Sequence, residues 1–149
     1  MLTRRIQARC ADFSVEVLFQ GAGRAAPDEG FLSGRRGRLS VVREVALKCG
    51  STPVVYAHSI ARLRDLRGPW RALATLGSRP LGAALFRNPR VLKHPLRFRR
   101  LNRHDAVHAR ARKALGTDLP SLWARRALYV LRGSPILVTE VFLPALLGR

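Results

Sequence analysis

Alternating apolar and polar residues mark two pairs of β-strands in this chain. The first pair is "RLSVVREVALKC" and "TPVVYAHSIARL", with Gly50-Ser51 between them. The second pair is "LWARRALYVLR" and "PILVTEVFLP", with Gly133-Ser134 between them. Gly-Ser dipeptides between β-rich runs are typical of tight turns with a positive φ at glycine, so each pair is predicted to form an antiparallel hairpin.

Further elements follow from the same reading. Strands are expected at 13–19 and 91–101. Helices are expected at 68–77 and 105–116, each ended by a glycine, and a short helix at 79–86. The segment 21–37 reads as a surface connection. About six strands with a few helices predict a single α+β domain over 1–149, built on an antiparallel sheet covered on one side.

Composition supports one folded domain. The chain has 149 residues, of which 47% are hydrophobic and 25% charged. No apolar run reaches the roughly 18 residues of a membrane span, and the basic N-terminus lacks the apolar core of a secretory signal. Cys10 and Cys49 show no pairing pattern, which favours a reducing compartment. A cytoplasmic location is therefore expected.

The net charge of +19 indicates anionic partners. Nucleic acid, a membrane surface and a small acidic substrate all fit that sign. The arginines, however, are spread over the whole chain, whereas a nucleic-acid module more often gathers them on one element and interleaves exposed aromatic residues. A solvated arginine-rich surface is favoured, and no nucleic-acid partner is expected.

Two opposite charges stand out because each lies in an apolar strand. Arg43 shares a strand face with Val41 and Val45, and Glu140 shares one with Val138 and Phe142. An unpaired buried carboxylate costs several kcal/mol, so Glu140 needs solvent, a partner or a ligand. A structural salt bridge or two solvent-facing residues would explain the pattern. The functional alternative is a closed pocket in which the arginine clamps a substrate carboxylate and the glutamate meets a hydroxyl or a proton.

Other candidate sites carry weaker signals. His104 and His108 stand four residues apart, but no third ligand is visible, so solvated helix histidines are favoured over a metal site. His58 fits either a pocket mouth or the surface. "GAGRAA" at 21–26 lacks the helix context of a dinucleotide loop. No serine or cysteine lies in a nucleophile elbow, which leaves covalent catalysis without a candidate.

Taken together, these segments resemble the chorismate lyase family. The resemblance runs through "VVREVALKC" with Arg43, "RPLGAALF" with Leu81, "LWARRALYVLRGSPILVTEVFLP" with Glu140, and the opening "LT" with Leu2. It covers nearly the whole chain in order, and the last block is the most specific part.

The resemblance implies a fold and an activity. The expected fold is a six-stranded antiparallel sheet with flanking helices and helical flaps over a buried pocket. The expected activity is conversion of chorismate to 4-hydroxybenzoate and pyruvate, the first step of ubiquinone synthesis, by a monomer without metal or cofactor. By similarity, Arg43 binds the ring carboxylate with help from the backbone amides of Leu2 and Leu81, and Glu140 meets the ring hydroxyl as a base or only as an orienting group. The ligand would then be the partner of the lone carboxylate.

The chain also departs from the family. Relatives carry a further N-terminal segment, so a missing segment is expected here, and they often carry arginine where His58 stands. Arg126 is expected to help attract a dianionic substrate. Two rival readings stay open: an effector-sensing domain of the same fold that binds a small carboxylate without converting it, and a basic nucleic-acid binder.

Overall fold

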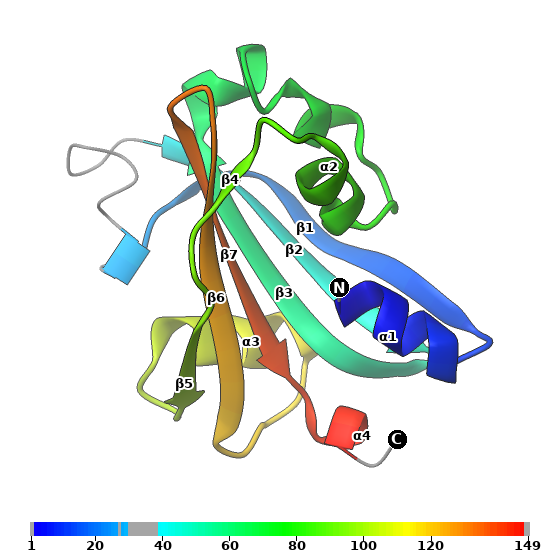
Figure 1. Ribbon diagram of the computed structural model, residues 1–149. Coiled ribbons are helices and arrows are strands. Elements are labelled where there is room, and N and C mark those ends of the chain that lie inside the picture. Colours follow the sequence, from blue (N-terminus) through cyan, green and yellow to red (C-terminus); the bar gives the residue numbers. More distant parts are fainter. Residues whose placement is uncertain (1, 27, 30–38, 148–149) are drawn as a thin grey trace.

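An antiparallel sheet of seven strands forms the centre of this computed structural model, which describes residues 2–26, 28–29 and 39–147 (Figure 1). The strands in these ranges are β1 (Phe13–Arg24), β2 (Leu39–Cys49), β3 (Thr52–Arg62), β4 (Leu92–Lys93), β5 (Arg97–Leu101), β6 (Leu122–Leu131) and β7 (Ser134–Phe142). The order across the sheet is β1-β2-β3-β7-β6-β4, and β5 also pairs with β6. The α+β prediction is confirmed, although six strands were expected.

The additional strand comes from a break in the predicted strand 91–101. β4 and β5 both pair with β6 and are separated by the segment around Pro95. Proline has no backbone N–H and cannot continue a ladder of hydrogen bonds. One predicted strand therefore becomes two short ones at the sheet edge.

Both predicted hairpins are confirmed. β2 and β3 are joined by Gly50-Ser51, and Gly50 has a φ of 61°. The turn between β6 and β7 consists of Arg132 (φ 51°) and Gly133 (φ 77°). Two consecutive positive φ values are typical of the tight hairpin turn whose twist matches the flanking strands. Ser134 pairs with Leu131 and belongs to β7, so the second predicted turn was placed one residue too late.

Helices cover both faces of the sheet. They are α1 (Leu2–Arg9), α2 (Leu81–Arg87), α3 (Ala106–Leu115) and the short α4 (Pro144–Leu147). Residues of α1 and α2 pack on the face that carries Val45 and Val138, whereas α3 packs on the opposite face with Tyr56 and Val141 (Figure 1). The expectation of a sheet covered on one side was therefore incomplete, and α1 was not predicted.

The helix predicted at 68–77 was wrong. This part of the chain forms a turn at 68–70 and the 3-10 helix η3 (Arg71–Thr75), and a second 3-10 helix, η2 (Leu63–Arg67), precedes it. The Trp70 indole N–H donates to the carbonyl of Ser134 at 2.8 Å, and Trp70 is buried between the two helices. This tertiary anchor holds Trp70 in a non-helical conformation (φ −101°, ψ 21°). By contrast, α2 and α3 confirm the predicted helices at 79–86 and 105–116, and Gly116 ends α3 with a φ of 67°.

The predicted surface connection at 21–37 is shorter than expected. β1 continues to Arg24, so residues 21–24 of the predicted connection belong to the sheet. Ala26 and Glu29 are buried, while 27 and 30–38 lie outside the described residues. None of the helices in the described ranges has the length and apolar character of a membrane span.

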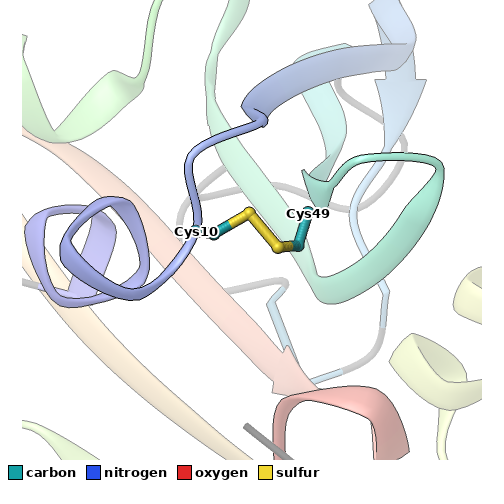
Figure 2. The surroundings of a disulfide bond; sticks show 2 residues. All are labelled: Cys10 and Cys49. Atoms are coloured by element: carbon teal, nitrogen blue, oxygen red, sulfur yellow. A yellow bond between two sulfur atoms is a disulfide. The ribbon is translucent and has the colours of Figure 1, made fainter.

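Cys10 and Cys49 form a disulfide, which corrects the prediction of two unpaired cysteines. Their Cα atoms are 5.8 Å apart. Figure 2 shows the bond between the chain that leaves α1 and the end of β2. Pairing of Phe13 with Cys49 in the β1–β2 ladder brings the two cysteines together, although they are 39 residues apart in sequence. The inference of a reducing compartment from unpaired cysteines therefore loses its basis.

Candidate active site

A cavity lies between the sheet and the helices α1 and α2. Apolar side chains of β2, β3 and β7 form its floor, and the two helices form its walls. The residues around it include Arg43, Val45, Leu47, Ala57, Ser59, Val138 and Glu140 from the central strands, Arg125 and Tyr129 from β6, Leu2 and Thr3 from α1, and Pro80, Leu81, Gly82, Leu85 and Phe86 around α2. All four residues predicted from the resemblance, namely Leu2, Arg43, Leu81 and Glu140, therefore lie around one cavity.

The sheet register explains how Arg43 and Glu140 come to face the same space. Arg43 pairs with Ser59 on β3, and Ser59 pairs with Val138 on β7. Glu140 lies two residues further along β7, so it points to the same side as Val138. β2 and β7 are two strand spacings apart, or about 10 Å. The two side chains thus lie at opposite ends of an apolar floor, where a planar ring could fit between them.

Arg43 is a buried cation with neutral partners. Its side chain donates to Oε1 of Gln20 at 2.8 Å and to the carbonyl of Arg79 at 3.0 Å. Only 4% of the residue is exposed. Burial lowers the pKa of the Arg43 guanidinium, because desolvation disfavours the charged form. Among the described residues, no carboxylate forms an ion pair with Arg43 within 4.0 Å.

A bulge in β1 places Gln20 beside this guanidinium. The register between β1 and β2 shifts between Val17 and Phe19, and Gln20 then pairs with Arg43. In a regular ladder without the bulge, Leu18 would pair with Glu44 and Phe19 would lie opposite Arg43. Gln20 Nε2 also donates to the carbonyl of Leu73 at 3.0 Å, which fixes the amide with its oxygen toward the arginine. The bulge therefore supplies a neutral hydrogen-bond acceptor instead of an aromatic ring.

Glu140 has a protein partner. Arg125 Nε lies 2.7 Å from Glu140 Oε1, and the two residues are directly opposite each other on β6 and β7. The two side chains are 21% and 17% exposed. The structural salt bridge considered from the sequence is therefore present, but with Arg125 and not with Arg43. A ligand between Arg43 and Glu140 would meet a carboxylate already oriented by a cation.

Tyr129 adds a phenol to the same wall of the cavity. It is buried, and its ring packs edge-on against Phe86 of α2, with the ring centroids 6.0 Å apart. Burial raises the pKa of Tyr129, and the charge of Glu140 raises it further, while Arg125 acts in the opposite sense. The phenol thus stays protonated at neutral pH, so it can donate a hydrogen bond.

Arg126, which is expected to help attract a dianionic substrate, does not line this cavity. As the neighbour of Arg125 on β6, it points to the opposite face. Its Nε donates to Thr139 Oγ1 at 2.8 Å, and its NH1 lies 2.8 Å from Asp28. The nearby arginine that the cavity uses is Arg125.

The four candidate residues could be found from alternation and resemblance, but Gln20, Arg125 and Tyr129 were missed. Gln20 carries no sequence signal, because the bulge that positions it is invisible in the alternation. Arg125 could have been found, since two residues that face each other across a hairpin follow from the turn. The one-residue error in the turn would have paired Glu140 with Ala127 instead, with both on the same face.

His58 lies on the opposite face of the sheet and is fully buried, so neither a pocket mouth nor the surface describes it. Its Nε2 is 2.9 Å from Glu29 Oε2, and its Nδ1 is 3.8 Å from Glu44 Oε2. Arg110 of α3 lies 3.1 Å from His58 Nε2 and 3.5 Å from Glu29. This group connects the segment after β1 with β3 and α3.

The pKa of His58 and the pKa of Glu29 move apart in this cluster. Burial alone would lower the His58 pKa, but hydrogen bonds to Glu29 and Glu44 outweigh it, so the pKa lies above 6.5. Burial alone would raise the Glu29 pKa, but the hydrogen bond and charge of His58 outweigh it, so the pKa lies below 4.5. The ionised pair therefore stabilises the folded state.

We expect the free energy of unfolding to decrease as pH rises above 6.5. A raised histidine pKa contributes stability that is complete below the unfolded pKa and is lost as pH rises through the folded pKa. The Glu29 contribution is present above pH 4.5 and is lost as pH falls through its folded pKa. Urea unfolding at about pH 5.5 and about pH 8.5 should differ by on the order of 1 kcal/mol.

A His58→Gln variant should lose most of this difference. His94→Gln is the matched control, because His94 is exposed and should leave the pH dependence intact. An equal pH dependence in wild type and His58→Gln would show that His58 is not the titrating group.

In the pair His104 and His108, both ring nitrogens of the second histidine contact protein groups. His108 is fully buried, which corrects the expectation of a solvated side chain. Its Nε2 lies 2.7 Å from the carbonyl of Pro120, and its Nδ1 contacts Arg112. No group of three potential metal ligands is found in the described ranges.

The comparisons with known proteins agree with the resemblance. The family model described as chorismate lyase matches residues 1–149. A protein named probable chorismate pyruvate-lyase from Nitrosomonas europaea is 50% identical over 146 residues, which are 97% of this chain and 82% of that protein. One of the same name from Aromatoleum aromaticum is 51% identical over 149 residues, covering 98% and 80%.

Solved structures with the same fold include domains of transcription regulators. The ligand-binding domain of a putative GntR-family regulator from Bordetella bronchiseptica matches with a TM-score of 0.59 and 16% identity, covering 89% of this chain and 86% of that chain. The effector domain of PhnF from Mycobacterium smegmatis matches with a TM-score of 0.59 and 12% identity, covering 97% and 89%. At these identities, the matches show a shared fold alone.

Proposed function

This chain belongs to the chorismate lyase family, and we propose that it converts chorismate to 4-hydroxybenzoate and pyruvate in the cavity between the sheet and α1 and α2. The observation that carries the proposal is the buried Arg43 guanidinium, which has only neutral described partners and faces an apolar floor with Glu140 at its other end. A buried cation of this kind is stabilised by an anionic ligand.

Arg43 binds the ring carboxylate of the substrate in this proposal. A guanidinium presents parallel N–H donors that match a carboxylate, and such charge-assisted bonds are roughly twice as strong as neutral ones. Leu2 and Leu81, the first residues of α1 and α2, line the same cavity, and the proposal assigns their backbone amides to this carboxylate. They would supply further donors to the carboxylate.

Glu140 lies at the end of the cavity where the ring hydroxyl would bind. In the reaction, the C–H bond at the hydroxyl-bearing carbon and the ether C–O bond of the neighbouring carbon break, and the new double bond completes the aromatic ring. The enolpyruvate that leaves takes up a proton at its methylene carbon and becomes pyruvate. The proton can pass to Glu140 as a general base. Glu140 could alternatively accept a hydrogen bond from the hydroxyl and only orient the ring. Arg125 holds Glu140 and offers a cation to the enolpyruvyl carboxylate.

The cavity must enlarge to admit the substrate. The cavity volume is about 70 Å³. Pockets that hold drug-sized ligands are generally about 300 Å³ or larger. We therefore propose that the two helices act as flaps, which open for the substrate and exclude water when they close. A closed, dry site strengthens the contacts with Arg43 and Glu140, and positioning can supply about 7–11 kcal/mol of the barrier.

The direct test is to mix the purified protein with chorismate without added metal. Formation of 4-hydroxybenzoate, followed by chromatography, and of pyruvate, followed by a coupled assay, should be equimolar. Absence of both products from a folded protein would contradict the proposed activity.

A binding-only role is the second candidate, because the structural matches include effector domains of regulators. Such a domain would bind 4-hydroxybenzoate or a related carboxylate and would not consume chorismate. Calorimetry with 4-hydroxybenzoate, beside the product assay, separates the two roles. Binding without turnover would favour the sensing domain.

We expect Gln20→Glu to weaken substrate binding by about tenfold, which corresponds to a loss of about 1.4 kcal/mol of binding free energy. The Arg43 guanidinium lies 2.8 Å from the amide oxygen of Gln20. A carboxylate at position 20 would therefore lie against this guanidinium and would neutralise the charge that binds the substrate. The KM for chorismate and the Kd for 4-hydroxybenzoate should rise together, with a smaller change in kcat.

Gln20→Met is the matched variant, since it removes the hydrogen bond without adding a charge. Its effect on the KM should be smaller than that of Gln20→Glu. Equal effects of the two variants would show that Gln20 acts through packing and not through the charge balance of Arg43.

A further inference from the structure

Large apolar side chains are exposed at the β4–β5 edge of the sheet, on the face that carries α2. Phe98 is 60% exposed, Trp123 51%, Leu96 44% and Phe86 42%. Contiguous exposed apolar surface of this kind usually marks a site of interaction. We call this surface the edge patch, defined by Phe86, Lys93, Leu96, Phe98, Arg100 and Trp123.

The members of the edge patch are neighbours in the structure. Arg100 of β5 pairs with Trp123 of β6, and Phe98 pairs with Arg125 in the same ladder. Side chains at paired positions lie on the same face of a sheet. The other members, Phe86, Lys93 and Leu96, line one surface hollow, to which Arg125 also belongs. Arg125 thus connects the two halves of the patch.

Cations lie over two of the three aromatic rings of this patch. Lys93 Nζ lies 4.5 Å from the centroid of the Phe86 ring, and the Arg100 guanidinium carbon lies 6.0 Å from that of Trp123. The hollow is lined by further basic residues, Arg4 and Arg87, and no carboxylate is among its described lining residues. The patch therefore combines exposed apolar area with positive charge.

We propose that the edge patch binds the surface of a bilayer that contains anionic lipids. Aromatic and leucine side chains suit the boundary between headgroups and acyl chains, while lysine and arginine reach the phosphates. Each basic residue near an anionic surface strengthens such binding. This is peripheral binding and requires no membrane span.

Other occupants fit the patch less well. A second copy of the chain would bring the same cations against each other, which opposes association. Single-stranded nucleic acid binds through bases stacked on free aromatic faces. Here Lys93 and Arg100 already cover one face of two rings, and Leu96 offers nothing to a base.

The patch adjoins the candidate active site. The hollow and the active-site cavity share residues from α1, α2 and β6, namely Thr3, Pro80, Gly82, Phe86, Arg125 and Tyr129. A protein bound through the edge patch would therefore have the α1–α2 opening next to the bilayer, and the product would be released there. The binding itself does not depend on the proposed activity.

The chain carries a natural reporter for the test. Of its two tryptophans, Trp70 is buried with 2% exposed, whereas Trp123 lies in the patch with 51% exposed. Vesicles of phosphatidylcholine and phosphatidylglycerol in equal parts should shift the tryptophan emission to shorter wavelength, and pure phosphatidylcholine vesicles should not. Trp123→Phe should lose the shift and still sediment with the anionic vesicles.

A double variant, Phe98→Ser with Trp123→Ser, should sediment with these vesicles at least about tenfold more weakly at unchanged net charge. Val17→Ser with Phe19→Ser is the matched control, because these exposed residues lie on β1 at the opposite edge of the sheet. Its binding should equal that of wild type.

Three results would overturn the proposal. Equal vesicle binding by the double variant and wild type would show adsorption by overall charge alone. A Trp123 response to a single-stranded oligonucleotide but not to vesicles would assign the patch to nucleic acid. A dimer in light scattering that disappears in the double variant would assign it to a second copy of the chain.

Discussion

Replacing Arg43 with alanine is expected to lower kcat/KM for chorismate by about 30-fold or more. Removing one partner of a buried, hydrogen-bonded charge pair costs about 2–5 kcal/mol, and about 1.4 kcal/mol corresponds to a tenfold change. The loss should be visible in the Kd for 4-hydroxybenzoate, measured by calorimetry, because Arg43 is proposed to bind the ring carboxylate in substrate and product alike.

The side chain of Arg43 is buried, so its removal also affects packing. Arg43→Met keeps most of the stem volume without the charge, and it should lose affinity like the alanine variant. Lys48→Met is the control on the same strand, because Lys48 pairs with Glu16 at 2.8 Å outside the cavity. Wild-type affinity in a folded Arg43→Met protein would refute the assignment of the carboxylate site.

Changing Glu140 to glutamine is expected to lower kcat by about 100-fold, within the range of about 10²–10⁴ that a general base contributes. Glutamine keeps the shape of the side chain but cannot accept the proton. The Kd for 4-hydroxybenzoate should change much less than kcat, because Arg43 and the apolar floor are unaltered. Steady-state kinetics and calorimetry on the same preparation measure both.

Full turnover by Glu140→Gln would show that Glu140 is not the base and only orients the ring. The preference of the protein for 4-hydroxybenzoate over benzoate tests the contact with the hydroxyl separately, and it should be smaller in the variant. Glu16→Gln is the control, since Glu16 is an exposed carboxylate paired with Lys48. Its kinetics should match those of wild type.

The local elements could be predicted where the signal lies within a few residues. Alternation and glycine turns located both hairpins, and the stop at Gly116 located the end of α3. The failures lie where distant contacts prevail over local preference. Trp70, for example, is held by the carbonyl of Ser134, 64 residues away, and the segment around it forms 3-10 turns instead of a helix.

The candidate site shows the same division. Alternation placed Arg43 and Glu140 on faces with apolar neighbours, and the resemblance proposed their roles. Only the pairing of β2 with β3 and of β3 with β7 shows that Arg43 and Glu140 lie on the same side of the sheet, at one cavity. The register of the other ladders decided which partners they have: the β1 bulge brings Gln20 to Arg43, and the β6–β7 turn brings Arg125 to Glu140.

The sequence by itself determined the two hairpins, the sides of their strands on which Arg43 and Glu140 lie, the excess of positive charge and the family. These properties depend on residue type and on spacings of two to four residues. The tertiary structure decided the burial of His58 between two carboxylates, the disulfide of Cys10 with Cys49, and the exposed aromatic edge beside the cavity. Each of these features depends on which distant segments of the chain become neighbours in space. The order and register of the strands decide those neighbours.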